Sequence, residues 1–347
     1  MKKALVSLCA AVFALAACGG GGGEGASRQQ IRIVGSSTVY PFTTAVAERF
    51  AQSNAQFAAP IVESTGTGAG LNLFCAGIGA QHPDVTNASR RIKASELEAC
   101  NRNGVAQVVE VPVGIDGLVL IESATRPTGF ALTERDIYAA LAANPFGRPQ
   151  TARTWADVNP SLPNVPILVY GPPPTSGTRD SFVELILNKG CETDPAMKAL
   201  KDTDADRQKA LCSQIREDGA FVEAGENDNL LMQRVADNQG AVGVLGYSFM
   251  ESNTDRVRGI PINGVAPTAE TITDFSFPGA RQMYIYVKGE HIGVVPGLPE
   301  FLQSYAQGWA PGGFLTQRGL IPSSAEVRQR AQQQITQPRP LTPADLG

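Results

Sequence analysis

The chain has 347 residues, which is enough for about two domains with a substantial hydrophobic core. Apolar residues make up 43% and charged residues 18%, proportions that exclude a wholly disordered chain and an integral membrane protein. Lysine and arginine total 29 against 33 aspartate and glutamate, so the net charge of −4 provides no basic field to hold nucleic acid.

The amino terminus has the pattern of an export signal followed by a tether. Two lysines precede an apolar run, Ala4–Ala17, which is too short to span a bilayer and typical of a signal-peptide core. The run ends Leu15-Ala16-Ala17-Cys18, which resembles a bacterial lipobox, where a peptidase cuts before the cysteine and the thiol carries a diacylglycerol. An ordinary signal peptide with an incidental cysteine is the alternative. We predict a signal peptide at residues 1–17, a lipid-anchored glycine-rich tether at residues 18–30, and a lipoprotein of the periplasm or cell envelope.

Past the tether, strand-like and helix-like patterns alternate, which indicates an α/β fold. In the first third of the chain we expect strands at 31–34, 60–63 and 84–85, with helices that begin at Pro41 and near Leu71. Two further strands, 108–113 and 118–121, are separated by Gly114-Ile115-Asp116-Gly117, which we interpret as a turn where the chain crosses between two lobes.

The rest of the chain continues the alternation. We expect a helix at 133–143, strands at 165–170, 241–245 and 283–287, and a helix after Gly177 that ends at Gly190 as its C-cap. The charged segment 192–210 is predicted to be a surface excursion. The polar tail after Arg328 contains several prolines and is predicted to be poorly ordered.

Four cysteines remain after the predicted signal peptide and Cys18 are set aside, and an even number in an exported chain indicates disulfides. Nearest-neighbour pairing predicts Cys75–Cys100 and Cys191–Cys212, although four cysteines allow three connectivities. A metal site formed by Cys75, His82 and Cys100 is the alternative, but it lacks the closely spaced cysteine pairs typical of such sites.

Three loops of glycine, serine and threonine each follow a strand and precede a helix: Gly35–Tyr40, Thr65–Gly70 and Thr175–Arg179. Helix N-termini present free N–H donors and a partial positive charge, and the hydroxyls add donors suited to an oxyanion. Each loop alone is better explained by a capped tight turn. Three in one chain, with Arg90 and Arg179 nearby, predict an anion-binding cage.

Enzymatic functions find little support. The segment Gly66–Gly70 lacks the full spacing and the acidic residue of a dinucleotide-binding motif. Ser176 is not in a G-x-S-x-G context, and neither of the two histidines, His82 and His291, has a local context that suggests a catalytic base. We therefore expect no catalysis, no cofactor and no metal.

The ordered motifs resemble those of the phosphate-binding protein of the Pst-type ABC importer across residues 31–320. They are Gly35-Ser36-Ser37-Thr38-Val39-Tyr40-Pro41, Gly66-Thr67-Gly68-Ala69-Gly70, Asn87-Ala88-Ser89-Arg90 and Ser176-Gly177-Thr178. The resemblance implies an α/β, two-lobed periplasmic binding protein, type II-like, with orthophosphate in the interlobe cleft and delivery to a membrane permease. Lobe I would comprise residues 31–113 and 259–347, and lobe II residues 114–258. A monomer is expected. The alternatives are the same fold with sulfate or molybdate as ligand, or a secreted phosphoesterase.

Matching the motifs position by position gives a predicted phosphate site. Its members are Ser37, Thr38, Val39, Thr67, Ser89, Arg90, Asp116, Ser176, Gly177, Thr178 and Arg179. Two positions depart from the family pattern: Arg90 stands where an aspartate usually accepts the phosphate proton, and Pro172 stands where an arginine is usual. Asp116 is the candidate replacement for the acceptor, and capping the turn is its alternative role.

Overall fold

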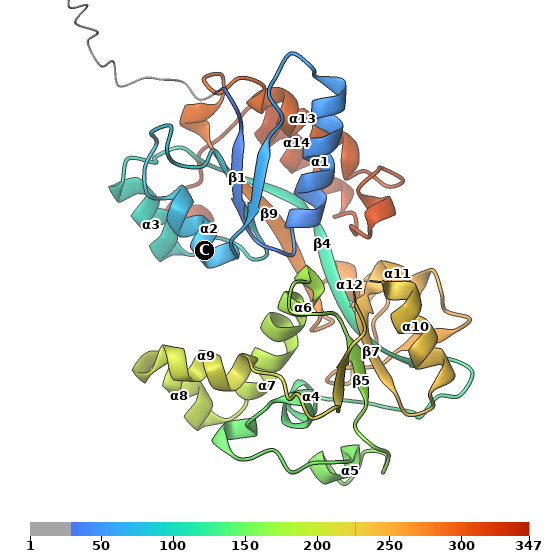
Figure 1. Ribbon diagram of the computed structural model, residues 1–347. Coiled ribbons are helices and arrows are strands. Elements are labelled where there is room, and N and C mark those ends of the chain that lie inside the picture. Colours follow the sequence, from blue (N-terminus) through green and yellow to red (C-terminus); the bar gives the residue numbers. More distant parts are fainter. Residues whose placement is uncertain (1–28, 226, 347) are drawn as a thin grey trace, which may run out of the picture.

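The computed structural model describes residues 29–225 and 227–346, so the predicted signal peptide, Cys18 and most of the tether lie outside the described residues. The described chain forms two bodies, one above the other in Figure 1. They are joined by the long strands β4 (Val108–Ser123) and β9 (Ala280–Lys288). The predicted two-lobed α/β architecture is therefore confirmed. Within these ranges no helix combines the length and the apolar character needed to cross a bilayer.

In the part of the chain that the structure describes, nine strands form one connected sheet in the order β2-β1-β3-β9-β4-β7-β5-β6, with β8 paired to β4. The shorter strands are β1 (Arg32–Gly35), β2 (Ile61–Ser64), β3 (Val85–Ala88), β5 (Val169–Gly171), β6 (Phe221–Glu223), β7 (Val242–Gly246) and β8 (Val257–Gly259). The strands β1, β2 and β3 run parallel, as do β5, β6 and β7. The strand β9 runs antiparallel to both β3 and β4. The carboxyl ends of the parallel strands of each body therefore carry the loops that lead into helices.

Helices cover the sheet in both bodies. They are α1 (Tyr40–Ser53), α2 (Thr67–Phe74), α3 (Ala94–Arg102), α4 (Glu134–Leu141), α5 (Trp155–Val158), α6 (Gly177–Phe182), the π-helical η2 (Val183–Leu187), α7 (Asn188–Cys191), α8 (Pro195–Thr203), α9 (Ala205–Ser213), α10 (Asp228–Asp237), α11 (Tyr247–Glu251), α12 (Ala269–Thr273), α13 (Leu298–Gly308) and α14 (Ala325–Thr336). Short 3₁₀ turns lie at Pro145–Gly147, Gly289–His291, Thr316–Arg318 and Pro343–Leu346.

The strand β4 is continuous over 16 residues, so the turn predicted at residues 114–117 is wrong. Its partner β9 pairs with it on both sides of that segment, from Val108 opposite Lys288 to Gly117 opposite Ala280. The irregularity is limited to a register shift between Pro112 and Gly114. Because β9 supplies hydrogen-bond partners throughout, the backbone stays extended where the two glycines suggested a turn.

Two other local predictions are also wrong. The helical segment that starts at α6 continues through Gly190 to Cys191, because Gly190 packs on α4: a β-carbon there would lie 2.1 Å from the Glu134 carbonyl oxygen. The glycine permits close helix packing and does not end the helix.

The tail predicted to be poorly ordered forms α14, which buries Ala331 and Ile335 against the upper body. The charged segment 192–210 forms α8 and most of α9.

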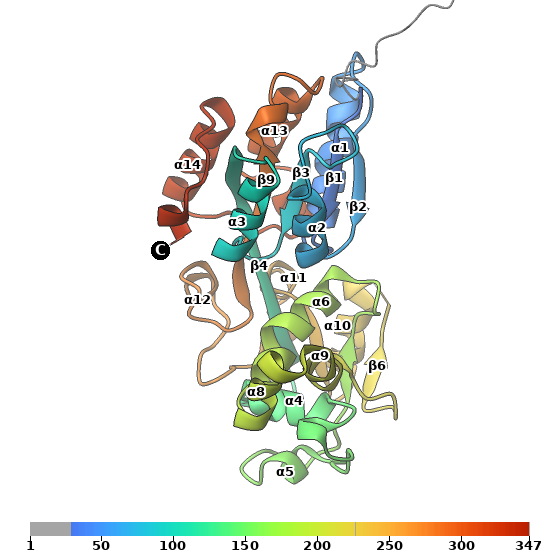
Figure 2. The same ribbon diagram turned by 90° about the vertical axis from the view of Figure 1, so that its left-hand side faces the viewer.

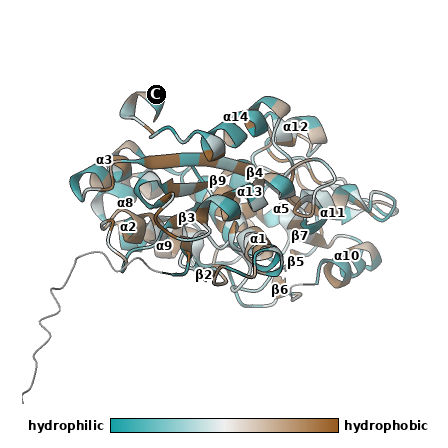
Figure 3. Cartoon of the chain, turned by 90° about the horizontal axis from the view of Figure 1, so that it is seen from above, coloured by the Kyte–Doolittle hydropathy of each residue, from teal (hydrophilic) through white to brown (hydrophobic). Residues whose placement is uncertain are grey.

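Each body has its own hydrophobic core. The upper body packs around Phe50, Phe301 and Tyr305, with a neighbouring cluster that includes Phe74 and Tyr286. The lower body packs around large buried side chains such as Trp155, Tyr138 and Phe182, and its core also includes Ile272 and Phe277. Figure 3 shows the hydrophobic residues gathered on the strands, while α14 on the outside is largely hydrophilic.

Both predicted disulfides are confirmed. Cys75 is bonded to Cys100, which joins the end of α2 to α3 in the upper body. Cys191 is bonded to Cys212, which joins α7 to α9 in the lower body. The alternative metal site is excluded, since two of its three ligands form a disulfide.

Candidate functional site

The three predicted loops lie between the end of a strand and the start of a helix. The first leads from β1 to α1, the second from β2 to α2, and the third from β5 to α6. Figure 2 shows α6 at the top of the lower body, directly below α2 of the upper body. The fold therefore turns helix N-termini from both bodies toward the region where the bodies meet.

The first and third loops are in direct contact. The hydroxyl of Ser37 donates a hydrogen bond to the carboxylate of Asp180, and the Thr38 hydroxyl lies 3.4 Å from the Gly177 carbonyl oxygen. Gly177 packs so closely that a β-carbon on it would lie 2.9 Å from the Cα of Thr38. The bodies thus touch through residues of the predicted site, in a closed arrangement.

The charged centre of this contact is Arg281 on β9, which the sequence analysis missed. Its Nη2 donates to the hydroxyls of Thr38 at 3.0 Å and Ser181 at 2.9 Å. Its Nε donates to Asp116 Oδ2 at 3.2 Å, consistent with the register that places the two residues opposite each other. The side chain is only 11% exposed. A single guanidinium, mostly shielded from solvent, therefore joins groups from both bodies and from the strands between them.

The signals for the missed residues were weak but present. Arg281 lies two residues before the strand predicted at 283–287, and its place in the site depends on the register that sets it opposite Asp116. Ser181 and Glu184 follow Gly177 at helical spacing, so they share its face of the helix. Helical spacing could have added both residues to the predicted site.

The second loop contributes a hydroxyl pair. Thr67 Oγ1 lies 2.9 Å from Ser89 Oγ, and it accepts the Ser89 backbone N–H at 3.1 Å. Both residues are buried. Ser89 Oγ also donates, at 3.4 Å, to the carboxylate of Glu184, which in turn binds Nη1 of Arg281. Glu184 therefore links the second loop to the arginine.

The two predicted cations, Arg90 and Arg179, are engaged by other groups. Arg90 forms a two-pronged ion pair with Glu96, at 2.7 and 2.9 Å, and this hydrogen bonding raises the pKa of the arginine. Arg179 lies over the Phe221 ring at 4.5 Å, donates to the Pro172 carbonyl, and has its pKa lowered by burial. In the described chain, neither guanidinium forms a hydrogen bond with Arg281 or with the side chains that Arg281 binds.

The remaining predicted donors have local roles. Ser176 is the N-cap of α6, and its hydroxyl accepts the Thr178 backbone N–H at 3.3 Å. The Val39 N–H donates to the Ser36 hydroxyl at 3.4 Å. His291 is buried between Asp84 and the Ile78 carbonyl, at 2.7 and 2.6 Å, and so lies in a different network from Ser176. These contacts provide no activated nucleophile at Ser176.

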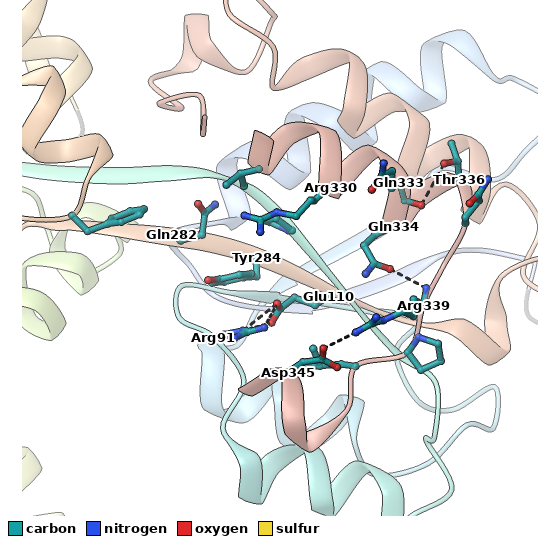
Figure 4. Close-up of a pocket in the computed structure, with 16 residues that line it drawn as sticks. Arg91, Glu110, Gln282, Tyr284, Arg330, Gln333, Gln334, Thr336, Arg339 and Asp345 are labelled. Carbon is teal, nitrogen blue, oxygen red and sulfur yellow. Dashed lines mark hydrogen bonds and ion pairs between the residues drawn. The ribbon is translucent and has the colours of Figure 1, made fainter. Parts of the chain in front are cut away.

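A cavity of about 560 Å³ lies beside Arg281 and Glu184. Its walls include Thr67, Ser89, Arg90, Glu184 and Arg281. A larger cavity, of about 1020 Å³, lies beside α14 and is shown in Figure 4. None of the predicted site residues lines it. Two of its arginines, Arg91 and Arg339, are paired with Glu110 and Asp345. The smaller cavity is therefore the candidate site.

Comparisons with known sequences agree with the predicted family and fold. Residues 21–307 match the PBP superfamily domain. Protein SphX of Synechococcus elongatus is 32% identical over 89% of this chain and 82% of its own length. The phosphate-binding protein PstS of Staphylococcus saprophyticus is 28% identical over 83% of this chain and 80% of its own length.

Solved structures have the same fold. A possible phosphate binding protein from Planctomyces limnophilus superposes with a TM-score of 0.70 at 26% identity, covering 88% of this chain and 97% of that one. An ABC-type phosphate transport receptor from Vibrio cholerae gives a TM-score of 0.56 at 20% identity, covering 84% and 99%. The names of these proteins describe binding and transport, which agrees with the prediction that the chain is not an enzyme.

Proposed function

Because this chain belongs to the PBP superfamily, we propose that it captures inorganic phosphate outside the cytoplasm and delivers it to an ABC importer. The observation that carries the proposal is Arg281, whose guanidinium is only 11% exposed and is held among hydroxyls from both bodies. The names of the PstS relative and of the Planctomyces limnophilus structure support phosphate as the ligand. The predicted loops supply the neutral donors. Arg281 supplies the positive charge that the family usually has from an arginine at the position of Pro172.

Binding would use donors from both lobes. Thr38, Thr67 and Ser89 come from the upper body, and Ser176, Gly177 and Thr178 come from the start of α6. An anion that accepts hydrogen bonds from both sides stabilises the closed form over the open one. Closure would in turn remove water from the anion and strengthen each hydrogen bond.

Asp116 is the proposed acceptor of the phosphate proton. The bonds from Ser181 and Arg281 both fall on its Oδ2 atom. In the described part of the chain, no hydrogen bond reaches the second oxygen, Oδ1, and the side chain is 19% exposed. Hydrogen phosphate can donate a proton to this oxygen, whereas sulfate at neutral pH would meet a repelling carboxylate.

The lobes and the anchor complete the proposal. We start from the predicted lobe I, residues 31–113 and 259–347, and lobe II, residues 114–258, and move residues 259–279 to lobe II. Ile272 and Phe277 pack in the lower core, which supports a second crossing within β9 and not at residue 259. Lipidation of Cys18 would tether the receptor to the membrane, and replacing Cys18 with alanine should release the mature chain as a soluble exported protein.

Calorimetric titration of the purified protein with phosphate, arsenate, sulfate and molybdate tests the function. The expected result is tight binding of phosphate and arsenate, which share a shape and a dissociable proton, and weak binding of the other two. Tighter binding of sulfate or molybdate would assign the fold to another oxyanion. Absence of binding by all four would overturn the proposal.

A further inference from the structure

Glu184 holds a position that an oxyanion would be expected to take. Its carboxylate accepts a hydrogen bond from Ser89 Oγ at 3.4 Å and forms an ion pair with Nη1 of Arg281. Both donors line the 560 Å³ cavity, as Glu184 does. A carboxylate and a tetrahedral oxyanion compete for the same kind of donor, because each presents charged oxygens to N–H and O–H groups.

The contact also joins the two bodies. Glu184 belongs to η2 of the lower body, whereas Ser89 follows β3 of the upper body and Arg281 lies on β9. A bond from η2 to both of them favours the closed arrangement when the anion is absent. The Glu184 side chain is 48% exposed, so it can turn toward solvent without unpacking a core.

The other carboxylates in the cluster are held more firmly. Asp116 accepts from Arg281 and Ser181 and is 19% exposed. Asp180 accepts from Ser37, where the first and third loops touch. Glu184 is therefore the acidic group best placed to leave. Lys189 lines the same cavity and offers a positive charge near which the carboxylate could rest after it turns.

We propose that Glu184 is an internal competitor that the bound oxyanion displaces from Arg281 and Ser89, and that it thereby selects for dianions. The proposal rests on the proposed function and deepens it. A dianion brings two negative charges to Arg281 where Glu184 brings one, so it binds the arginine more strongly and displaces the carboxylate. A monoanion such as nitrate offers no more charge than Glu184 and faces a tethered rival of high local concentration.

The test compares Glu184→Gln with Glu192→Gln. Both changes remove one negative charge from the wall of the same cavity, but Glu192 pairs with Lys201 and, in the described chain, forms no hydrogen bond or ion pair with Arg281 or Ser89. We expect Glu184→Gln to tighten phosphate and sulfate by a similar factor, roughly two- to fivefold, and to make nitrate binding measurable. Glu192→Gln should leave all three affinities unchanged.

Several results would overturn the idea. Unchanged affinities in Glu184→Gln, or equal gains in Glu192→Gln, would show that Glu184 does not compete specifically. Weaker phosphate binding with sulfate unaffected would show that Glu184 accepts the phosphate proton instead. Matching thermal unfolding of both variants and wild type confirms that folding is intact.

A second measurement does not depend on any ligand. Small-angle X-ray scattering of the ligand-free protein should give a larger radius of gyration for Glu184→Gln than for wild type and Glu192→Gln, because the contact between the bodies is lost. If wild type and variants bind no oxyanion, the proposed function fails. The scattering then still decides: equal radii would refute the Glu184 bridge, and a larger radius for Glu184→Gln would support it.

Discussion

Gly177 packs directly on Ser37 across the contact between the two bodies: a β-carbon on Gly177 would lie 2.7 Å from the Ser37 carbonyl oxygen. The two residues are the first of α6 and a member of the loop before α1. Their proximity means that closure depends on the absence of a side chain at position 177. The glycine of the third loop therefore has a steric function besides any donor role of its N–H.

Gly177→Ala is expected to weaken oxyanion binding while leaving the fold intact, because the added methyl group obstructs only the closed form. Overpacking of this kind typically costs about 1–3 kcal/mol, which corresponds to roughly a five- to 150-fold loss of affinity. Calorimetry measures the loss. Gly246→Ala is the matched control, since a β-carbon there meets no atom within 4 Å and should leave binding unchanged. Wild-type affinity in Gly177→Ala would show that the ligand does not require this contact.

Arg281 and Arg90 should differ sharply when each is replaced by glutamine. Arg281→Gln removes the charge from the hydroxyl cluster and should weaken phosphate by at least one to two decades, since one charged hydrogen bond contributes roughly 1.5–3 kcal/mol. Arg90→Gln removes a charge that both Glu96 oxygens already engage, and it should have the smaller effect. The two variants lose the same formal charge, so long-range attraction is matched. A larger loss for Arg90 would place the principal cation on the other side of the cavity.

The sequence predicted the secondary-structure elements more fully than the charged residues of the site. Local patterns were enough for the loops, the disulfides and most strands, because strand, loop and helix boundaries depend on neighbouring residues. The turn expected around Asp116 failed because its backbone is set by β9, a strand more than 160 residues away in the chain. Arg281 was missed for the same reason: its role depends on the register with β4, and no local pattern encodes that register.

Asp116→Asn is expected to change selectivity. Asparagine keeps the shape of the side chain and an oxygen for Ser181, but it removes the negative charge that, in our proposal, repels sulfate and accepts the phosphate proton. Phosphate affinity should fall by about one to two decades, while sulfate affinity stays equal or rises. Titrations of both anions at neutral pH give the ratio directly. An unchanged ratio would mean that Asp116 only positions Arg281 and Ser181.

The last prediction concerns acid stability and the pair formed by Arg216 and Asp218 in the lower body. The buried Arg216 donates to Asp218 at 2.5 and 2.7 Å, and these hydrogen bonds lower the pKa of the aspartate from 3.8 to about 2. Arg216 also donates to the carbonyl oxygens of Ala140 and Ala152, both at 3.0 Å, which fixes its guanidinium in place. The ion pair therefore anchors the segment before β6 to the lower core.

Because the folded-state pKa of Asp218 is lowered, the unfolded chain takes up the proton first as the pH falls. The stabilisation is thus fully present above pH 3.8 and is lost progressively as the pH approaches about 2. The pair adds only modestly to the free energy of unfolding, because the aspartate side chain is 39% exposed and solvent screens the interaction. Urea unfolding of wild type and Asp218→Asn should show a free-energy difference that is constant above this range and shrinks within it. A difference that stays constant down to pH 2 would show that the charge of Asp218 does not contribute to folding.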